Sequence, residues 1–247
     1  MKKFIAVITV LLFISPFSFA QRKGKETQQR YTPKFDYVPA TRDPVAKNNI
    51  SILLMRPIFI DRDIAVAGSP WSEFSKSMGN DLEELITAKG FIIRGDVFNS
   101  YDDMVYSDKA NSDLIITAEI DFHANDDRKT KSVFVLSSTP AFKVAEGNVG
   151  ITVSVILTAI SPVTKQKLWK KNLSLPVRNF TYQGSIRWAT APSVLAEMNE
   201  DVNLWNPMCK DLEDIYQESM NTIWKQFDPS ELKSIAIESK KADGKIK

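Results

Sequence analysis

The chain has 247 residues, of which 43% are hydrophobic and 25% are charged, and its formal net charge at pH 7 is +2. This balance is typical of a globular protein and excludes collagen-like, disulfide-scaffold and wholly disordered chains, which need a strong compositional bias. A single cysteine and a single histidine exclude an internal disulfide, a cysteine-rich zinc site and most histidine-based metal sites, so the composition favours a protein that is not an enzyme and carries no cofactor.

Residues 1–20 have the pattern of a secretory signal peptide. Two lysines precede an uncharged apolar run over residues 4–14, and residues 18–20 (Ser-Phe-Ala) form a small-x-small cleavage site. The run is shorter than the roughly 20 residues that a transmembrane helix needs. We therefore expect export with cleavage after Ala20, to the periplasm or the outer-membrane surface. No cysteine follows the run, so we expect no lipid anchor.

The charge is unevenly distributed along the rest of the chain. Positive residues concentrate in residues 21–49 and 233–247, which predicts a flexible N-terminal arm and a charged C-terminal tail around an acidic body. Within the arm, Tyr31, Phe35 and Tyr37 alternate with polar residues, which indicates that part of it lies against the body. The absence of a basic face argues against a nucleic-acid partner, whereas the basic ends are compatible with peripheral association with the outer membrane.

The first half of the expected body, residues 50–232, alternates strands with a helix. Ser69, Pro70 and Gly90 fit the N-cap, the first helical position and the residue after the last turn of that helix. The expected elements are a buried strand over residues 50–60, an amphipathic helix over 70–89, and strands over 91–93 and 113–122. This order is typical of a crossover β-α-β unit with parallel strands.

The second half has the pattern of an antiparallel meander. Its expected elements are a short strand over residues 132–136, a hairpin of 149–160 with 167–175, an irregular aromatic-rich insertion over 177–206, and a long helix over 207–227 followed by a short one from Asp228. Asn206 would be the N-cap of the long helix and Pro207 its first residue. The fold class predicted is a one-domain α/β (α+β) mixed sheet with two long amphipathic helices packed on it.

The search for catalytic chemistry is mostly negative. The sequence contains no P-loop, no G-x-G-x-x-G, no G-x-S-x-G and no H-E-x-x-H motif. Cys209 lies near the start of the long helix, where the helix dipole lowers a thiol pKa. A nucleophile there would need a base such as His123, which lies in another element, so a buried structural thiol is the favoured interpretation.

An oxygen-rich segment surrounds His123. Alternation places Glu119 and Asp121 on one face of a strand, where paired carboxylates can act as acid and base on a sugar, and the acidic residues after it include Asp126 and Asp127. Calcium also prefers oxygen ligands, but the spacing of a calcium-binding loop is absent. A solvated strand end remains the favoured interpretation.

A basic run, Arg128, Lys129, Thr130 and Lys131, follows this segment. Arginine pairs well with carboxylates such as that of sialic acid, so these four residues are the candidate ligand-binding residues. The alternative is a solvated charge run at the tip of a hairpin. The insertion that follows the hairpin is aromatic, and its rings can either stack on a sugar or cover a small core.

The order of elements resembles the neuraminyllactose-binding hemagglutinin family of bacterial surface proteins. The resemblance rests on the phrases DLEELITAKGF (81–91), SDLIITAEI (112–120) and ISPVTK (160–165), together with the basic run, and extends over about residues 50–230. That family is similar in layout to the amino-terminal domains of TolB and the curli-secretion lipoprotein. The resemblance implies a non-enzymatic envelope protein that binds sialylated glycans through a Lys/Arg-Thr run, of which residues 128–131 match only a part.

Two functions follow as hypotheses. In the first, the chain is an adhesin-like binding module for a glycan or an envelope protein partner. In the second, it is a periplasmic structural or assembly factor of an outer-membrane machine. A carboxylate hydrolase that uses Glu119 and Asp121 is a third, weaker hypothesis. The sequence contains no signal for the oligomeric state.

Overall fold

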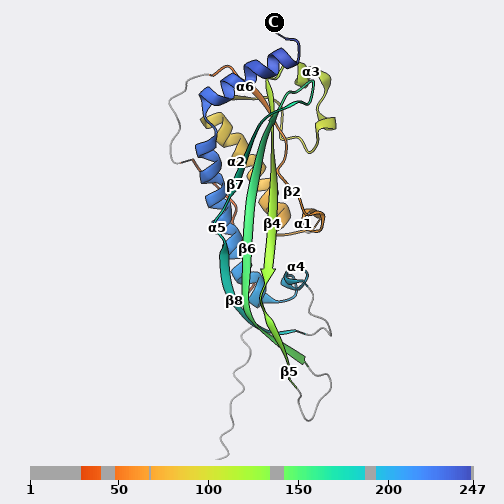
Figure 1. Cartoon of the computed structure of the whole chain (residues 1–247), viewed down its shortest axis with the longest axis vertical. Coiled ribbons are helices and arrows are strands. Elements are labelled where there is room, and N and C mark those ends of the chain that lie inside the picture. Colours follow the sequence, from red (N-terminus) through yellow and green to blue (C-terminus); the bar gives the residue numbers. More distant parts are fainter. Residues whose placement is uncertain (1–28, 40–47, 67, 134–141, 187–192, 246–247) are drawn as a thin grey trace, which may run out of the picture.

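Strands and helices alternate in a computed structural model that describes residues 29–39, 48–66, 68–133, 142–186 and 193–245. These residues form a mixed α/β fold in which helices pack on a sheet of eight parallel and antiparallel strands (Figure 1). The expected fold class is therefore confirmed. The expected signal peptide and its cleavage site after Ala20 lie outside the described residues, and no helix within them is both long and apolar enough to cross a bilayer.

The bounds of the elements are as follows. The strands are β1 (Ser51–Leu54), β2 (Ile58–Phe59), β3 (Ile92–Ile93), β4 (Leu114–Asp126), β5 (Lys129–Val133), β6 (Phe142–Ile160), β7 (Lys167–Ser174) and β8 (Arg178–Ile186). The helices are α1 (Arg62–Val66), α2 (Trp71–Ala88), α3 (Tyr106–Ala110), α4 (Val194–Met198), α5 (Val202–Gln226) and α6 (Pro229–Ala242), with a short 3-10 turn, η1 (Tyr101–Asp103).

Strand β6 organises the sheet because it is 19 residues long and pairs with four other strands. Along one edge it pairs antiparallel with β4 and then with β5, and along the other with β7 and then with β8. Strand β1 lies parallel between β3 and β4, and β2 continues beside β4. The crossover start and the antiparallel hairpin of β6 with β7 are therefore as the sequence predicts.

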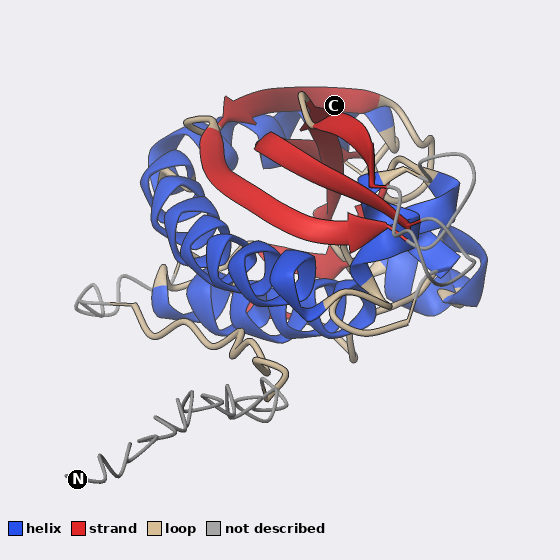
Figure 2. Cartoon of the chain, turned by 90° about the horizontal axis from the view of Figure 1, so that it is seen from below, coloured by secondary structure: helices blue, strands red, loops and turns tan. Residues whose placement is uncertain are grey.

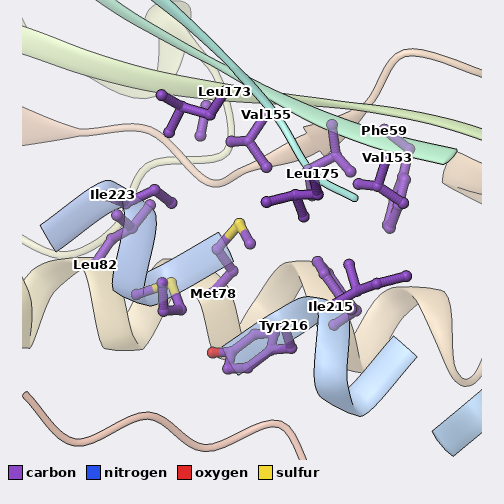
Figure 3. Packing of buried hydrophobic residues seen from close by; sticks show 14 of the residues in the cluster. Phe59, Met78, Leu82, Val153, Val155, Leu173, Leu175, Ile215, Tyr216 and Ile223 are labelled. Carbon is purple, nitrogen blue, oxygen red and sulfur yellow. The ribbon is translucent and has the colours of Figure 1, made fainter. Parts of the chain in front are cut away.

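One face of this sheet forms the main hydrophobic core. Because side chains alternate along a strand, β4 and β6 each turn a row of apolar residues toward α2 and α5, and Figure 2 shows the long helices beside the curved layer of strands. In Figure 3, Met78 and Leu82 of α2 meet Ile223 of α5 below Val155 of β6. Leu82 is fully buried, and burial of such a side chain contributes about 1.5–3 kcal/mol.

Both long helices start at residues other than those expected. Helix α2 begins at Trp71 with Pro70 as its N-cap, and Ser69 supplies no cap hydrogen bond. Helix α5 begins at Val202, where the Asp201 side chain accepts from the backbone N–H of Asn203 at 2.8 Å.

The expected start of α5 at Pro207 is wrong, since Pro207 lies inside the helix. Burial of Leu204 and Trp205 in the core explains the extra turn, because it offsets the backbone hydrogen bond that proline cannot donate. The Asn206 side chain does not cap the helix. It accepts from the backbone N–H of Tyr31 at 2.8 Å and donates to the carbonyl of Gln29 at 3.2 Å, and so fastens the N-terminal arm.

The expected irregular insertion over residues 177–206 is also wrong in part. Residues 178–186 form β8, which pairs with β6 from Ile151 back to Lys143, and Ser193 caps the short helix α4. Between Arg178 and Gln183, buried Tyr182 and half-buried Phe180 alternate with exposed polar residues, which is the period-2 pattern of a half-buried strand. Trp188 lies outside the described residues.

The described parts of both basic ends pack against the body, which the aromatic alternation predicts for the arm but the charge pattern does not predict for the C-terminal segment. In the described part of the arm, Phe35 and Tyr37 are buried, and the Tyr37 backbone N–H donates to Asp81 at 2.8 Å. Tyr216 of α5 donates to the same carboxylate, whose pKa is raised by burial despite these hydrogen bonds. At the other end, α6 runs to Ala242, so most of the expected tail 233–247 is helix and lies across the end of the sheet (Figure 1).

Candidate binding surface on the open face of the sheet

The basic run is divided between the two faces of the sheet. Lys129 and Lys131 lie opposite Glu146 and Val144 of β6, whereas Thr130 lies opposite Ala145. Ala145 is a core residue, so alternation along β5 places the two lysines on the face that turns away from the helices. The run therefore does not form one continuous ligand-binding patch.

Arg128 is occupied inside the fold. Its guanidinium Nε and Nη2 donate to the two carboxylate oxygens of Asp126, both at 2.8 Å, and its Nη1 donates to Glu197 of α4, also at 2.8 Å. The Arg128 side chain is only 2% exposed and lies 4.9 Å from the centre of the Tyr182 ring. This arginine therefore joins the β4–β5 junction to α4.

Within this network, Arg128 and Asp126 stabilise each other's charged forms. Burial by itself lowers the pKa of the Arg128 guanidinium, but hydrogen bonds to Asp126 and Glu197 outweigh burial and raise it. The same guanidinium lowers the pKa of Asp126. Burial, together with a 2.5 Å hydrogen bond to Asp201, raises the pKa of the Tyr182 hydroxyl. Arg128 therefore stays protonated, Asp126 ionised and the Tyr182 hydroxyl neutral at neutral pH, so the network serves as a structural link.

The lysines belong to a larger polar surface, which we call the open face. It is the side of β4 to β8 opposite the main core. At its end near β3 a small cluster of Leu53, Met104 and Ile115 adjoins it, and Tyr101 of η1 packs against this cluster. By strand register, its exposed or half-exposed side chains are mostly polar, with the aliphatic Val144 and Ile156 among them: Thr117, Glu119, Asp121, His123, Asn125, Lys129, Lys131, Val144, Glu146, Asn148, Thr152, Ser154, Ile156, Lys170, Asn172, Ser174, Asn179, Thr181, Gln183 and Ser185.

A glycine brings two amide side chains together in the middle of the open face. Gly150 pairs with Asn125 of β4 on one side and with Asn179 of β8 on the other. A Cβ atom at position 150 would lie only 2.9 Å from Asn179 Oδ1 and 3.5 Å from the Cβ of Asn125. Because Gly150 has no side chain, the Asn125 and Asn179 amides can occupy the space above its backbone, where they offer hydrogen-bond donors and acceptors close together.

The acidic segment also lies on the open face but forms no metal site. His123 Nε2 lies 3.0 Å from Asp121 Oδ1, and both side chains are well exposed, at 67% and 36%. Among the described residues no group of three or more His, Cys, Asp or Glu side chains is placed to bind a metal ion.

Cys209 lies on the opposite side of the sheet from His123, buried in the main core. Burial raises the pKa of its thiol to about 12, so it stays protonated at neutral pH. The expectation of a structural thiol agrees with this placement. A Cys209–His123 catalytic pair does not.

The sequence reasoning missed the β8 part of this surface. Asn179, Thr181 and Gln183 alternate with Phe180 and Tyr182, a signal that the aromatic content of the insertion obscured. Asn125 belongs to the oxygen-rich segment around His123, and Gly150 to the expected hairpin strand over residues 149–160. Their juxtaposition with Asn179 depends on the pairing of β6 with both neighbours, which residue spacing does not encode.

No protein-family model matches the chain, and no curated protein matches its sequence. Among solved structures, the chain is similar to a neuraminyllactose-binding hemagglutinin homolog from Helicobacter pylori, with a TM-score of 0.56 at 14% identity over 85% of this chain and 100% of that one. At this identity the likeness shows a shared fold. A lipoprotein from Neisseria meningitidis also matches, over 61% of this chain and 92% of its own at 12% identity, but its TM-score of 0.27 supports no argument.

Proposed function

We propose that the chain is an exported, non-enzymatic binding protein of a bacterial cell envelope, which recognises a sialylated glycan through the open face. The observation that carries the proposal is the open face itself. The long helices all pack on the other side of the sheet, and the strands present hydroxyl, amide and lysine side chains to solvent, together with the carboxylates of Glu119, Asp121 and Glu146. Such groups suit a ligand rich in hydroxyls that also carries a carboxylate.

The two lysines of the basic run supply the positive charge for this ligand. Lys131 Nζ lies 2.5 Å from Glu146 Oε1, and the two side chains are 70% and 47% exposed. Exposed ion pairs contribute little net stability, so the ammonium can exchange its partner for the carboxylate of a ligand. Arg128 stays in its buried network, and the proposal therefore assigns recognition to Lys129 and Lys131 within the original run. The signal-peptide pattern and the fold of the H. pylori homolog support the envelope location.

Binding of sialyllactose, with lactose as the uncharged reference, tests the proposal. We expect the double variant Lys129→Ala/Lys131→Ala to weaken sialyllactose binding at least tenfold, because two charge-assisted contacts at about 1.5–3 kcal/mol each are at stake. Gly150→Ala should also weaken binding, since the new methyl group must displace the Asn179 amide.

The matched control is Lys225→Ala/Lys233→Ala, which removes the same charge from exposed positions on α5 and α6. It should bind like the unaltered chain. If the two double variants bind sialyllactose equally well, or if the chain binds no sialylated sugar on a glycan array, the sialic-acid proposal is refuted.

The free strand edges favour assembly with a protein partner as the second candidate function. Among the described residues β5 pairs with β6 alone, as do β7 and β8, and an unpaired edge accepts an additional strand. Cross-linking in whole cells from a photoreactive residue at position 131 would then trap one dominant envelope protein. If the chain binds sialyllactose but forms no cross-link at that position, the protein-partner function is ruled out and only the glycan function remains supported.

A further inference from the structure

A pocket separate from the centre of the open face lies at the edge of the sheet, where β1 gives way to β2. Its volume is about 380 Å³, and the residues that matter for its chemistry are Arg56, Phe59, Trp71, Ser72, Lys76 and Asn99. This size falls in the range of pockets that hold small molecules, roughly 300–1,000 Å³. The pocket is made by three segments: the β1–β2 link, the first turns of α2 and the loop after β3.

The charge in this pocket has one sign. Arg56 comes from the β1–β2 link and Lys76 from the second turn of α2, and no carboxylate is among the residues that line the pocket. Neither cation takes part in an ion pair with the residues that the structure describes. Two cations that line one pocket give it a positive potential, which attracts an anion.

The wall of the pocket is apolar, and its aromatic side chains are largely buried. Trp71 and Phe59 are 4% and 6% exposed, and their rings meet edge to face with centroids 5.7 Å apart. Ile58, which also lines the pocket, is 51% exposed. A large exposed aliphatic side chain beside buried aromatic rings offers apolar area that a ligand can cover.

Polar groups complete the lining without adding charge. Ser72 and Asn99 are exposed there, whereas the Ser75 hydroxyl is used within the fold because it donates to the Pro57 carbonyl. The hydroxyl and the amide can each donate to a ligand oxygen. The pocket therefore combines two cations, two further donors and an apolar wall.

We infer that this pocket binds a small carboxylate with an apolar body, such as a medium-chain fatty acid. The carboxylate lies between Arg56 and Lys76, and the hydrocarbon body covers Ile58 and the wall formed by Phe59 and Trp71. The inference is independent of the proposed glycan function, because the pocket shares no residue with Lys129, Lys131 and Gly150.

Titration of the full chain with sodium octanoate by calorimetry tests the inference, with 1-octanol as the uncharged probe. We expect one octanoate site per chain, which weakens at high ionic strength. Arg56→Gln and Lys76→Gln should each weaken octanoate binding about tenfold or more, since a charge-assisted contact contributes about 1.5–3 kcal/mol. Neither substitution should change the weaker binding of 1-octanol.

Lys225→Gln is the matched control, because Lys225 is exposed on α5 and outside the pocket. Lys76 is itself exposed, so Lys76→Gln should fold normally. It therefore keeps the test valid even if Arg56→Gln fails to fold. Absence of octanoate binding, or equal affinities for the unaltered chain and both pocket variants, would overturn the inference. Sialyllactose binding by the same pocket variants should stay unchanged, which separates failure here from failure of the proposed function.

Discussion

At the scale of single residues, the main difference between sequence and structure concerns Arg128. As part of a basic run it looks like a ligand-binding group, yet its side chain is 2% exposed and all three of its side-chain nitrogens donate to Asp126 or Glu197. The cause is the junction between β4 and β5, where Gly147 of the paired strand approaches the Arg128 backbone too closely for a Cβ atom. Arg128 is thereby turned toward α4 while its neighbour Lys129 faces solvent.

Replacement of Arg128 should therefore lower the free energy of unfolding, not the affinity for a ligand. Arg128→Met leaves Glu197, which is 5% exposed, as a buried charge without its partner, and we expect a loss of about 3–5 kcal/mol in the free energy of unfolding. Urea denaturation followed by circular dichroism measures this. Lys129→Met, one position along, should change stability by no more than about 0.5 kcal/mol.

The double variant Arg128→Met/Glu197→Gln separates a buried ion pair from simple loss of packing. Removal of both charges should recover part of the stability, because the unpaired carboxylate is the main cost. If the double variant is as unstable as the sum of the two single variants, the network does not act as a coupled unit.

At the scale of elements, burial of apolar side chains decides where helices begin and end. Capping residues correctly indicate that α2 ends near Gly90, whose φ of +84° fits the left-handed conformation favoured by glycine. They fail at α5, where Pro207 looks like a first residue but the helix extends upstream to bury Leu204 and Trp205. Capping residues therefore do not decide where a helix starts when one further turn buries additional apolar side chains in the core.

Helix α6 offers a direct test, because it contains two isoleucines in contrasting positions. Ile235 is 7% exposed and packs in the main core, whereas Ile237 is 43% exposed. We expect Ile235→Ala to lower the free energy of unfolding by about 2–4 kcal/mol and Ile237→Ala to lower it by less than about 1 kcal/mol. Thermal and urea unfolding measure both. Equal small effects would mean that this segment behaves as the flexible tail expected from its charge.

At the scale of the whole molecule, the fold has a protected centre and a more exposed end. The first half of β4 lies between β1 and β6, and Leu114 to Ile116 are buried on both faces. Strand β5 has a single described partner and carries exposed Lys129, Thr130 and Lys131. The surface proposed for glycan recognition thus extends from the stable centre to the less protected end.

Hydrogen exchange should reproduce this gradient. We expect backbone amides of β4 from Leu114 to Ile120 to exchange slowest, at the rate of global unfolding, and those of β5 to exchange fastest among the strands. Exchange followed by mass spectrometry after proteolysis measures both in one experiment. Protection of β5 equal to that of β4 would indicate that another strand or partner covers its free edge in solution.

The sequence by itself determines the mixed α/β class, the crossover start, the β6–β7 hairpin and the two long amphipathic helices, because hydrophobic periodicity depends only on which residues follow one another. It also identifies a thiol and a histidine that belong to different elements. Only the tertiary structure decides that β8 completes the sheet, that Arg128 faces the core and Lys129 the solvent, and that Asn125 and Asn179 meet over Gly150. These features depend on strand register and on contacts between residues distant in the chain, which no local pattern records.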